Sequence, residues 1–260
     1  MEGSRMDYFW KQQDDIPSGL GYPVFGSVHI LSVGVTLLIT GVLVYLICHM
    51  NFNRQKRILK GIPILMLCME LFKDIFLISI HRFGLWYLPF HICSIGIFIF
   101  ILREYIPWQW AKDFFGELSY VLIFPGSVIA LIFPDWTIYY PVMNFMNLYS
   151  YMWHGMLIVY PVALRLNGYV HPSARRMYWI ILFLGCITPL MYAFDKITGC
   201  NFFFVNFPVP NSPLSFMASF MGNPGYLIGY AVLVITVVLL VYGMDYLCSK
   251  IISKGRIKKL

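Results

Sequence analysis

Seven apolar stretches, separated by polar segments, divide the chain. Each is long enough to cross a hydrocarbon core of about 30 Å as a helix. None alternates apolar and polar residues as a half-buried strand does, and a helix satisfies its own backbone hydrogen bonds in lipid. The sequence therefore predicts an all-α, polytopic membrane bundle of seven transmembrane helices. The predicted spans cover residues 26–49, 62–80, 86–103, 117–133, 145–166, 177–195 and 223–247.

These spans divide the chain into three parts. Residues 1–25 form a predicted extracytoplasmic N-terminal segment, residues 26–247 the transmembrane domain, and residues 248–260 a basic cytoplasmic tail. The first part contains acidic residues and glycines but no short apolar core, so a cleavable signal peptide is not indicated. No internal repeat is apparent, which is consistent with one domain.

The distribution of basic side chains predicts the orientation of the bundle. Most of the 19 Lys and Arg residues fall on one side, and far fewer fall on the other. The basic side comprises the segments 50–61, 103–116, 165–176 and 248–260. The opposite side holds Arg5, Lys11, Arg82 and Lys196. By the positive-inside rule the N-terminus lies outside and the C-terminus in the cytoplasm. We therefore expect a multi-pass protein of the cell membrane.

Composition excludes a soluble globular domain. The chain is 59% hydrophobic and 12% charged, whereas soluble domains carry about 25% charged residues. The net charge of +7 comes from the basic face and tail, which are expected to attract anionic lipid headgroups rather than nucleic acid. The six cysteines form no C-x-x-C pair, so neither a zinc ribbon nor a disulfide framework is indicated.

Ionisable side chains inside the apolar spans are the strongest functional signal. A charge at the bilayer centre costs at least about 2.5–3.5 kcal/mol, so such groups are rare without a role. Glu70, Lys73 and Asp74 stand at i, i+3 and i+4, on one face of the second span. Lys73 can neutralise only one of the two carboxylates. The cluster is either a structural ion pair that joins helices or part of a substrate site.

A histidine and a cysteine lie near the predicted outer end of the third span. On a regular helix His91 and Cys93 point about 200° apart, so they are not expected to bond directly. Pro89 fits the first turn of this helix, whose dipole favours a Cys93 thiolate while burial opposes it. His154 lies about 14 Å along the fifth span, at an overlapping depth. Each residue alone is typical of a packed core, but together they predict one site.

The external segment 196–224 is unusually apolar for a loop and contains several prolines. We expect it either to cap or re-enter the bundle, or to rest on the membrane surface as an ordinary loop. Aromatic residues, Trp136 among them, gather at the predicted span ends. Their positions are typical of an interfacial aromatic belt.

Four short motifs follow one another in the order found in a known membrane family. They are Leu88-Pro89-Phe90-His91-Ile92-Cys93, Glu117-Leu118-Ser119-Tyr120, Trp153-His154-Gly155 and Gly199-Cys200-Asn201-Phe202-Phe203-Phe204. Over about residues 85–245 the chain resembles the YwaF-type integral membrane family. The resemblance implies a multi-span helical bundle related to animal lipid acyltransferases that use a cysteine and a histidine. Carried over by motif, these are Cys93 and His154. One departure is Ser94, where many bacterial members have an acidic residue.

Three functional hypotheses remain open. The preferred one is acyl transfer or hydrolysis on membrane phospholipids, with Cys93 as nucleophile, His154 as general base, and His91 or Asp74 orienting it. The alternative is a small-solute or proton-coupled transporter or receptor centred on Glu70, Lys73 and Asp74. A zinc site or a bis-histidine haem ranks last, because the ligands follow no recognisable zinc pattern, and no metal or cofactor is expected. The candidate substrate-binding residues are Asp74, Glu70, Lys73, Asn147 and Asn201.

Overall fold

The computed structural model describes the backbone of residues 5–257 and the side chains of residues 7–250. In that part of the chain every regular element is a helix and no strand occurs, as the sequence predicts. The α-helices are α1 (Ser27–Cys48), α2 (Phe52–Ser79), α3 (Ile92–Tyr105), α4 (Gln109–Leu118), α5 (Phe124–Ile132), α6 (Phe145–Leu166), α7 (Met177–Thr198), α8 (Pro213–Met221) and α9 (Tyr226–Ile257). Short 3₁₀ turns are η1 (Arg5–Tyr8), η2 (Gln13–Asp15), η3 (Leu85–Tyr87), η5 (Ala174–Arg176) and η6 (Phe202–Phe204).

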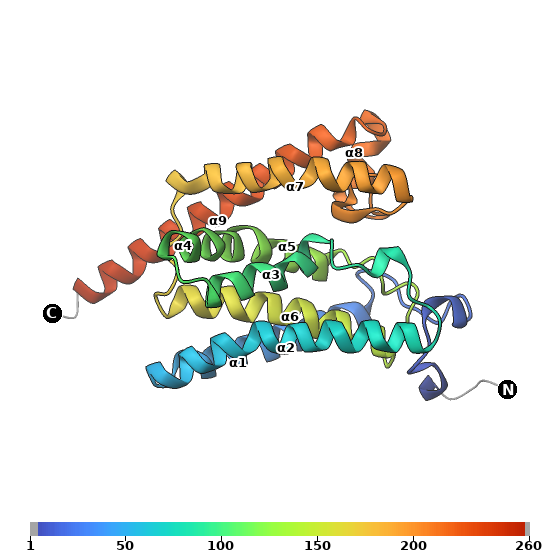
Figure 1. Ribbon diagram of the computed structural model, residues 1–260, viewed down its shortest axis with the longest axis horizontal. Helices are drawn as coiled ribbons and strands as arrows, with labels where there is room; N and C mark the ends of the chain where they lie inside the picture. Colours follow the sequence, from blue (N-terminus) through green and yellow to red (C-terminus); the bar gives the residue numbers. More distant parts are fainter. Residues whose placement is uncertain (1–4, 258–260) are drawn as a thin grey trace.

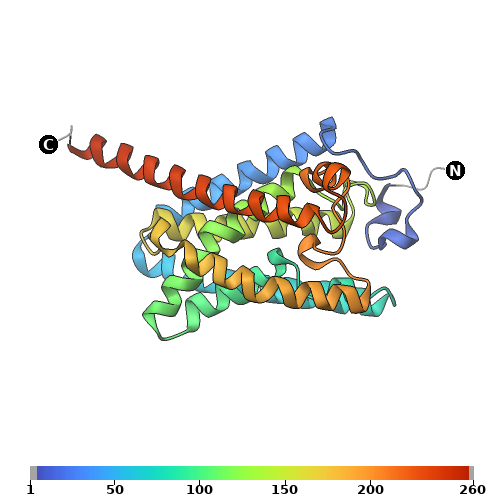
Figure 2. The ribbon, with the colours of Figure 1, turned by 90° about the horizontal axis from the view of Figure 1, so that it is seen from above.

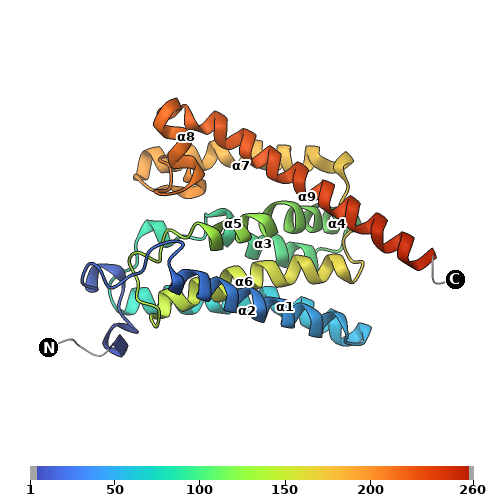
Figure 3. The same ribbon diagram turned by 180° about the vertical axis from the view of Figure 1, so that it is seen from behind.

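The long helices form rods that run alternately in opposite directions, in three layers (Figure 1). A π-helical turn, η4 (Ser119–Ile123), joins α4 and α5 into one rod. α1, α2 and α6 form one outer layer, α3 and the α4–α5 rod the middle, and α7 to α9 the other outer layer (Figures 1 and 3). The C-terminal part of α9 extends beyond the other helices (Figure 2).

Helix length and hydropathy mark four segments of the described chain as able to cross a membrane. They are 27–48, 109–132, 174–198 and 226–250. α2 carries charged residues, but its exposed side chains between Ile64 and Ile78 are apolar. Its charged Glu70 and Lys73 are buried on the opposite side. An extended apolar exterior of this kind is expected of a surface that faces lipid.

α6 is the central helix of the bundle. It packs against α1, α2, α3 and α5, and most of its side chains are buried. Two glycines permit this close packing. A Cβ added at Gly96 in α3 would lie 2.8 Å from the Leu157 side chain in α6, and one at Gly155 would lie 3.3 Å from the Thr40 hydroxyl in α1. Small residues at such positions let membrane helices approach closely.

Several helix boundaries differ from the predicted spans. α2 begins ten residues before the predicted start at residue 62, because the Asn51 side chain caps it by accepting from the Arg54 N–H. The α4–α5 rod likewise begins at Gln109 rather than at residue 117. Both extensions convert basic segments that were predicted as loops into helix. Hydropathy missed them because it follows the apolar part of a helix rather than its hydrogen bonds.

The predicted start of the third span, at residue 86, is also wrong. α3 begins at Ile92, and His91 is its N-cap with an extended backbone. Pro89 therefore precedes the helix instead of occupying its first turn. η3 is a separate turn at the predicted start of the span. At the other end of the chain, α9 continues through Ile257, into the segment predicted as a tail; residues 258–260 lie outside the described chain.

The segment between α7 and α9 is folded inward as a cap on the bundle. Phe202 is fully buried, and its N–H donates to the buried carboxylate of Asp195 at 3.0 Å. The Tyr226 hydroxyl donates to the Phe204 carbonyl at 2.7 Å, and this bond fixes η6 to the start of α9. Residues 200–205 therefore cap the bundle, whereas Phe216 and Phe220 of α8 are exposed.

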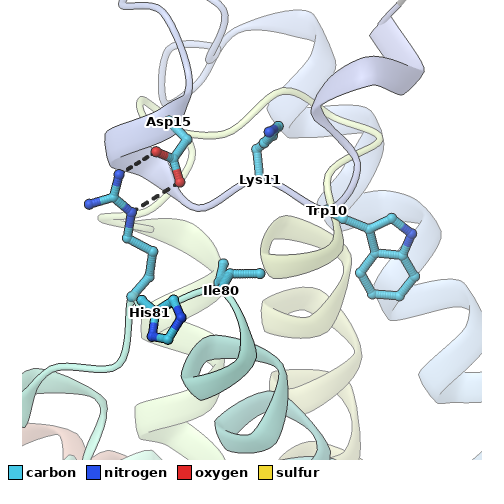
Figure 4. A pocket seen from close by; sticks show the side chains of 6 residues that line it. Trp10, Lys11, Asp15, Ile80 and His81 are labelled. Carbon is cyan, nitrogen blue, oxygen red and sulfur yellow. Dashed lines mark hydrogen bonds and ion pairs between the residues drawn. The ribbon is translucent and has the colours of Figure 1, made fainter.

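The N-terminal segment is held against the same end of the bundle. Asp15 forms a two-pronged ion pair with Arg82, which follows α2, and Arg82 Nε donates at 3.1 Å (Figure 4). Asn144, which caps α6, donates to the carbonyls of Tyr8 and Lys11 at 2.7 and 2.8 Å. These contacts close the bundle at the end where α3 begins.

Candidate functional site

A cavity of about 510 Å³ lies inside the bundle, next to the start of α3. This volume is in the range of small-molecule sites. Its walls come from α2, α3, η4, α5, α6, α7 and α9, together with the 134–144 segment and η6. The cavity has a polar wall and an apolar wall. The polar wall includes Lys73, His91, Cys93, Asp135, Ser150 and His154.

The start of α3 forms one side of the polar wall. Cys93 is the second residue of the helix, and the His91 side chain makes no capping hydrogen bond. Among the described residues the backbone N–H groups of Ile92 and Cys93 have no hydrogen-bond partner, whereas the backbone and side chain of Ser94 hydrogen-bond the Cys93 thiol. The ring of His91 packs edge-on against that of Phe202, with centroids 4.9 Å apart. Free N–H groups and the helix dipole both favour negative charge at this point.

His154 faces the cavity from α6 with a defined tautomer. Its Nδ1 lies 2.8 Å from the carbonyl oxygen of Ser150, one turn earlier. Because a carbonyl only accepts, Nδ1 carries the proton and the lone pair is on Nε2. Nε2 has no hydrogen-bond partner among the described residues. The ring stacks on Trp136, with centroids 5.2 Å apart and planes 6° apart. The Ser150 carbonyl and Trp136 therefore hold the ring in place, and its Nε2 is left without a partner in the described chain.

Glu70, Lys73 and Asp74 form a connected network beside the cavity. Lys73 Nζ donates to Glu70 at 2.7 Å and lies 3.2 Å from Asp74. The other Glu70 oxygen accepts from the hydroxyl of Tyr149, a cavity-lining residue of α6. Lys73 alone of the three charged residues lines the cavity, and it also donates to the Tyr87 carbonyl at 3.3 Å. The network therefore joins α2, α6 and the segment before α3.

The two asparagines singled out by sequence lie away from the cavity. Asn147 is buried; it accepts from the Tyr22 hydroxyl at 2.8 Å and donates to the Val142 carbonyl at 2.9 Å. Asn201 accepts from the N–H of Asn206 and of Phe207 and closes the turn after η6. The structure brings together Cys93, His154, His91 and Lys73 in the cavity wall, with Glu70 and Asp74 behind Lys73. Neither asparagine joins them.

Sequence reasoning missed Asp135, Tyr149 and the role of Trp136. Asp135 follows the Phe133-Pro134 end of a span, where an acidic residue reads as an ordinary loop position. The Asp135 side chain is exposed and lines the cavity. Desolvation by the surrounding protein raises the pKa of its carboxyl group. Tyr149 lies one helical turn before Trp153 and five residues before His154. This proximity to the Trp153-His154 motif was the signal that could have assigned Tyr149 to the site. Trp136 was predicted to lie in an aromatic belt, but it instead packs on His154.

The described residues offer no metal centre of the usual kind. No group of three or more His, Cys, Asp and Glu side chains among them is arranged to hold an ion.

The fold defines a helical, multi-pass membrane protein whose cavity is lined by cysteine, histidine, lysine and aspartate side chains. The chain belongs to the TMEM164 family, whose family model matches residues 24–242. That range runs from just before α1 into α9, and it contains every cavity-lining residue except Gln13. No curated protein sequence matches the chain. A search of solved structures likewise found no match.

Proposed function

We propose that this protein is an enzyme that transfers or hydrolyses fatty acyl groups of membrane lipids. The observation that carries the proposal is that Cys93 of α3 and His154 of α6 line one cavity, with the basic nitrogen of His154 unpaired. The motif resemblance to YwaF-type proteins and to cysteine–histidine lipid acyltransferases points to the same pair. Membrane phospholipids are the proposed substrates.

The reaction divides into two balanced steps. In the first, His154 Nε2 takes the Cys93 thiol proton while sulfur attacks the carbonyl carbon of a lipid ester. The ester C–O bond breaks, His154 returns the proton to the leaving alkoxide, and an acyl thioester remains on Cys93. In the second, His154 takes a proton from a lipid alcohol or water, whose oxygen attacks the thioester. The C–S bond then breaks and the thiol is regenerated.

The first turn of α3 is suited to stabilise the charge that develops on the carbonyl oxygen. The N–H groups of Ile92 and Cys93, which are unpaired in the described chain, lie beside the nucleophile, and both residues line the cavity. Donors aimed at an oxyanion are worth about 2.7–4 kcal/mol each in well-studied acyl transfer. The sequence could not locate these donors because they belong to the backbone.

In this proposal the Ser150 carbonyl, which accepts from His154 Nδ1, takes the orienting role that the sequence-based hypothesis gave to His91 or Asp74. This assignment leaves His91, Lys73 and Asp135 to contact substrate. Lys73 and His91 can meet a phosphate or ester oxygen, because both face the cavity from its polar wall.

A solute or proton pathway through the Glu70, Lys73 and Asp74 network is the second candidate. One Asp74 oxygen is buried without a hydrogen bond, although it lies 3.2 Å from Lys73. Proton-coupled uptake into vesicles that is abolished by Asp74→Asn and unaffected by Cys93→Ser would favour this function over acyl chemistry.

The proposal includes the topology. We infer that seven rods cross the membrane, with the N-terminus outside and the C-terminus in the cytoplasm. These rods are α1, α2, α3, the α4–α5 rod, α6, α7 and α9. The alternating rods, the apolar exposed face of α2 and the basic residues at one end of the bundle support this arrangement.

Reconstitution of the purified full chain into phospholipid vesicles tests the function. Acyl exchange or fatty-acid release, measured by mass spectrometry, should be lost in Cys93→Ala and His154→Ala. Cys186→Ala, which changes an exposed cysteine of α7, is the matched control and should retain activity. Full activity in both cavity variants would overturn the proposal.

A further inference from the structure

The apolar wall of the cavity is built from two facing helical stripes. On α9 the lining residues Tyr230, Leu233, Val234, Val237 and Val238 recur at the spacing of one helix face. On α5 the lining residues Pro125, Gly126, Ile129, Ala130 and Phe133 do the same. Apart from the Tyr230 hydroxyl, these side chains are apolar. Each stripe spans eight residue steps, or about 12 Å of helix.

The two stripes leave space between them because α9 packs on the bundle only further along its length. Val238, Val241 and Tyr242 belong to the main core cluster, where they meet Val121 and Leu122 of η4. Toward its N-terminal end α9 diverges from α5 (Figure 3). Residues of both helices line the cavity in this interval. The π turn η4 stands at the point of divergence, and such turns are frequent at functional sites.

We propose that the interval between α5 and α9 is the seat of a lipid acyl chain, entered from the bilayer. Both stripes lie within segments long and apolar enough to cross a membrane, so the interval is at hydrocarbon depth. Its Phe133 end adjoins Asp135 and Trp136, the polar wall that also holds Cys93 and His154. A chain seated there places its ester at the nucleophile. Only the placement of the ester at Cys93 rests on the proposed function. Binding of an acyl chain between α5 and α9 does not depend on catalysis.

A glycine provides a direct way to fill the seat. A Cβ added at Gly126 meets no atom within 4 Å, so a larger side chain there enters open space. Gly41 on α1 has the same freedom but is exposed and does not line the cavity. Gly126→Phe and Gly41→Phe therefore form a matched pair. Ala130→Phe fills the same interval from the next turn and serves if Gly126→Phe does not fold.

The experiment uses the full chain carrying Cys93→Ser, so that its outcome is independent of catalysis. The protein is placed in vesicles of phosphatidylcholine with a diazirine near the end of one acyl chain, irradiated, and mapped by mass spectrometry. We expect adducts on Ile129 or Ala130 and on Val234 or Val237. These adducts should fall several-fold in Gly126→Phe or Ala130→Phe and persist in Gly41→Phe.

Two results would overturn the acyl seat. One is adducts confined to outward-facing residues such as those of α1; the other is stripe adducts that persist when the interval is filled. Absence of stripe adducts from the protein with an unfilled interval, together with activity that still needs Cys93 and His154, would refute the seat and leave the function standing. Stripe adducts in a protein whose activity is indifferent to Cys93 would do the reverse.

Discussion

At the scale of single residues, a main-chain carbonyl oxygen fixes which ring nitrogen of His154 donates a hydrogen bond. The Ser150 carbonyl fixes the proton on Nδ1, and stacking on Trp136 fixes the plane of the ring. A sequence can indicate that a histidine lies in an apolar span, but not which atom it bonds. This is why His91 and Asp74 were assigned an orienting role that Ser150 performs.

The Lys73–Glu70 pair gives a prediction about stability. Lys73→Met removes the cation that neutralises a buried carboxylate, and breaking a buried pair in this way typically costs about 3–5 kcal/mol. Glu70→Gln combined with Lys73→Met should recover at least half of the loss, because the amide still accepts from Tyr149. Unfolding in detergent, followed by tryptophan fluorescence, measures both variants.

Lys60→Met is the control for that comparison, because Lys60 is an exposed lysine on the same helix. It should unfold like the parent protein. If the double variant is no more stable than Lys73→Met, the loss comes from packing around Lys73 and not from an uncompensated charge.

At the scale of elements, the sequence predicted where helices exist better than where they begin. The predicted span 145–166 coincides with α6, because Asn144 is both a polar boundary and the residue that caps the helix. The predicted start of the third span fails because aromatic residues continue the apolar run through η3. The start of α3 is also where the free N–H groups lie, so the error falls at the proposed catalytic position.

Gly96 tests the close packing that positions α3. A Cβ at Gly96 would lie 2.8 Å from Leu157 and 3.3 Å from Ile123, so Gly96→Val must displace one of these side chains. Overpacking of this kind costs about 1–3 kcal/mol. Because Cys93 is on the same helix, one turn earlier, labelling of Cys93 should change as well. Gly41→Val on α1, where the added atoms meet nothing, should leave stability and labelling almost unchanged.

The attachment of the N-terminal segment should depend on pH. The hydrogen bond and charge of Arg82 hold the pKa of Asp15 below its ordinary value. A carboxyl with a lowered pKa stabilises the folded form above its unfolded pKa of about 3.9, and this contribution is lost as the pH falls through the lower folded value. Limited proteolysis near the N-terminus should be faster in Asp15→Asn than in the parent protein at neutral pH. The difference should vanish in acid, and Asp14→Asn should show none.

At the scale of the whole molecule, hydropathy predicted an all-helical membrane protein but not the cavity. The depth argument placed His91 and Cys93 of one span, His154 of a second, and Glu70 and Asp74 of a third at overlapping depths, and the first three residues line one cavity. It could not place Asn147 or Asn201, whose polar side chains tie backbone segments together instead. Side-chain direction in the capping segments depends on tertiary contacts that no local pattern records.

The side of the membrane on which each connection lies is a prediction about the whole molecule. Biotin-acceptor tags after Leu260, after Gly168 in the α6–α7 connection, and after Asn211 before α8 would report on the two sides of the membrane. A cytoplasmic biotin ligase should label the first two and not the third. Labelling at Asn211, or its absence after Leu260, would contradict the seven-span orientation.

The central claim is that Cys93 and His154 act as one unit in the cavity. It is tested most directly by treating the full chain with a phospholipid analogue that carries a thiol-reactive group at the ester position, and quantifying Cys93 adducts by mass spectrometry. We predict that Cys93 is labelled ahead of the exposed Cys68, Cys186 and Cys248, and that His154→Ala abolishes labelling at Cys93 alone. Equal labelling of Cys93 with and without His154 would contradict the account.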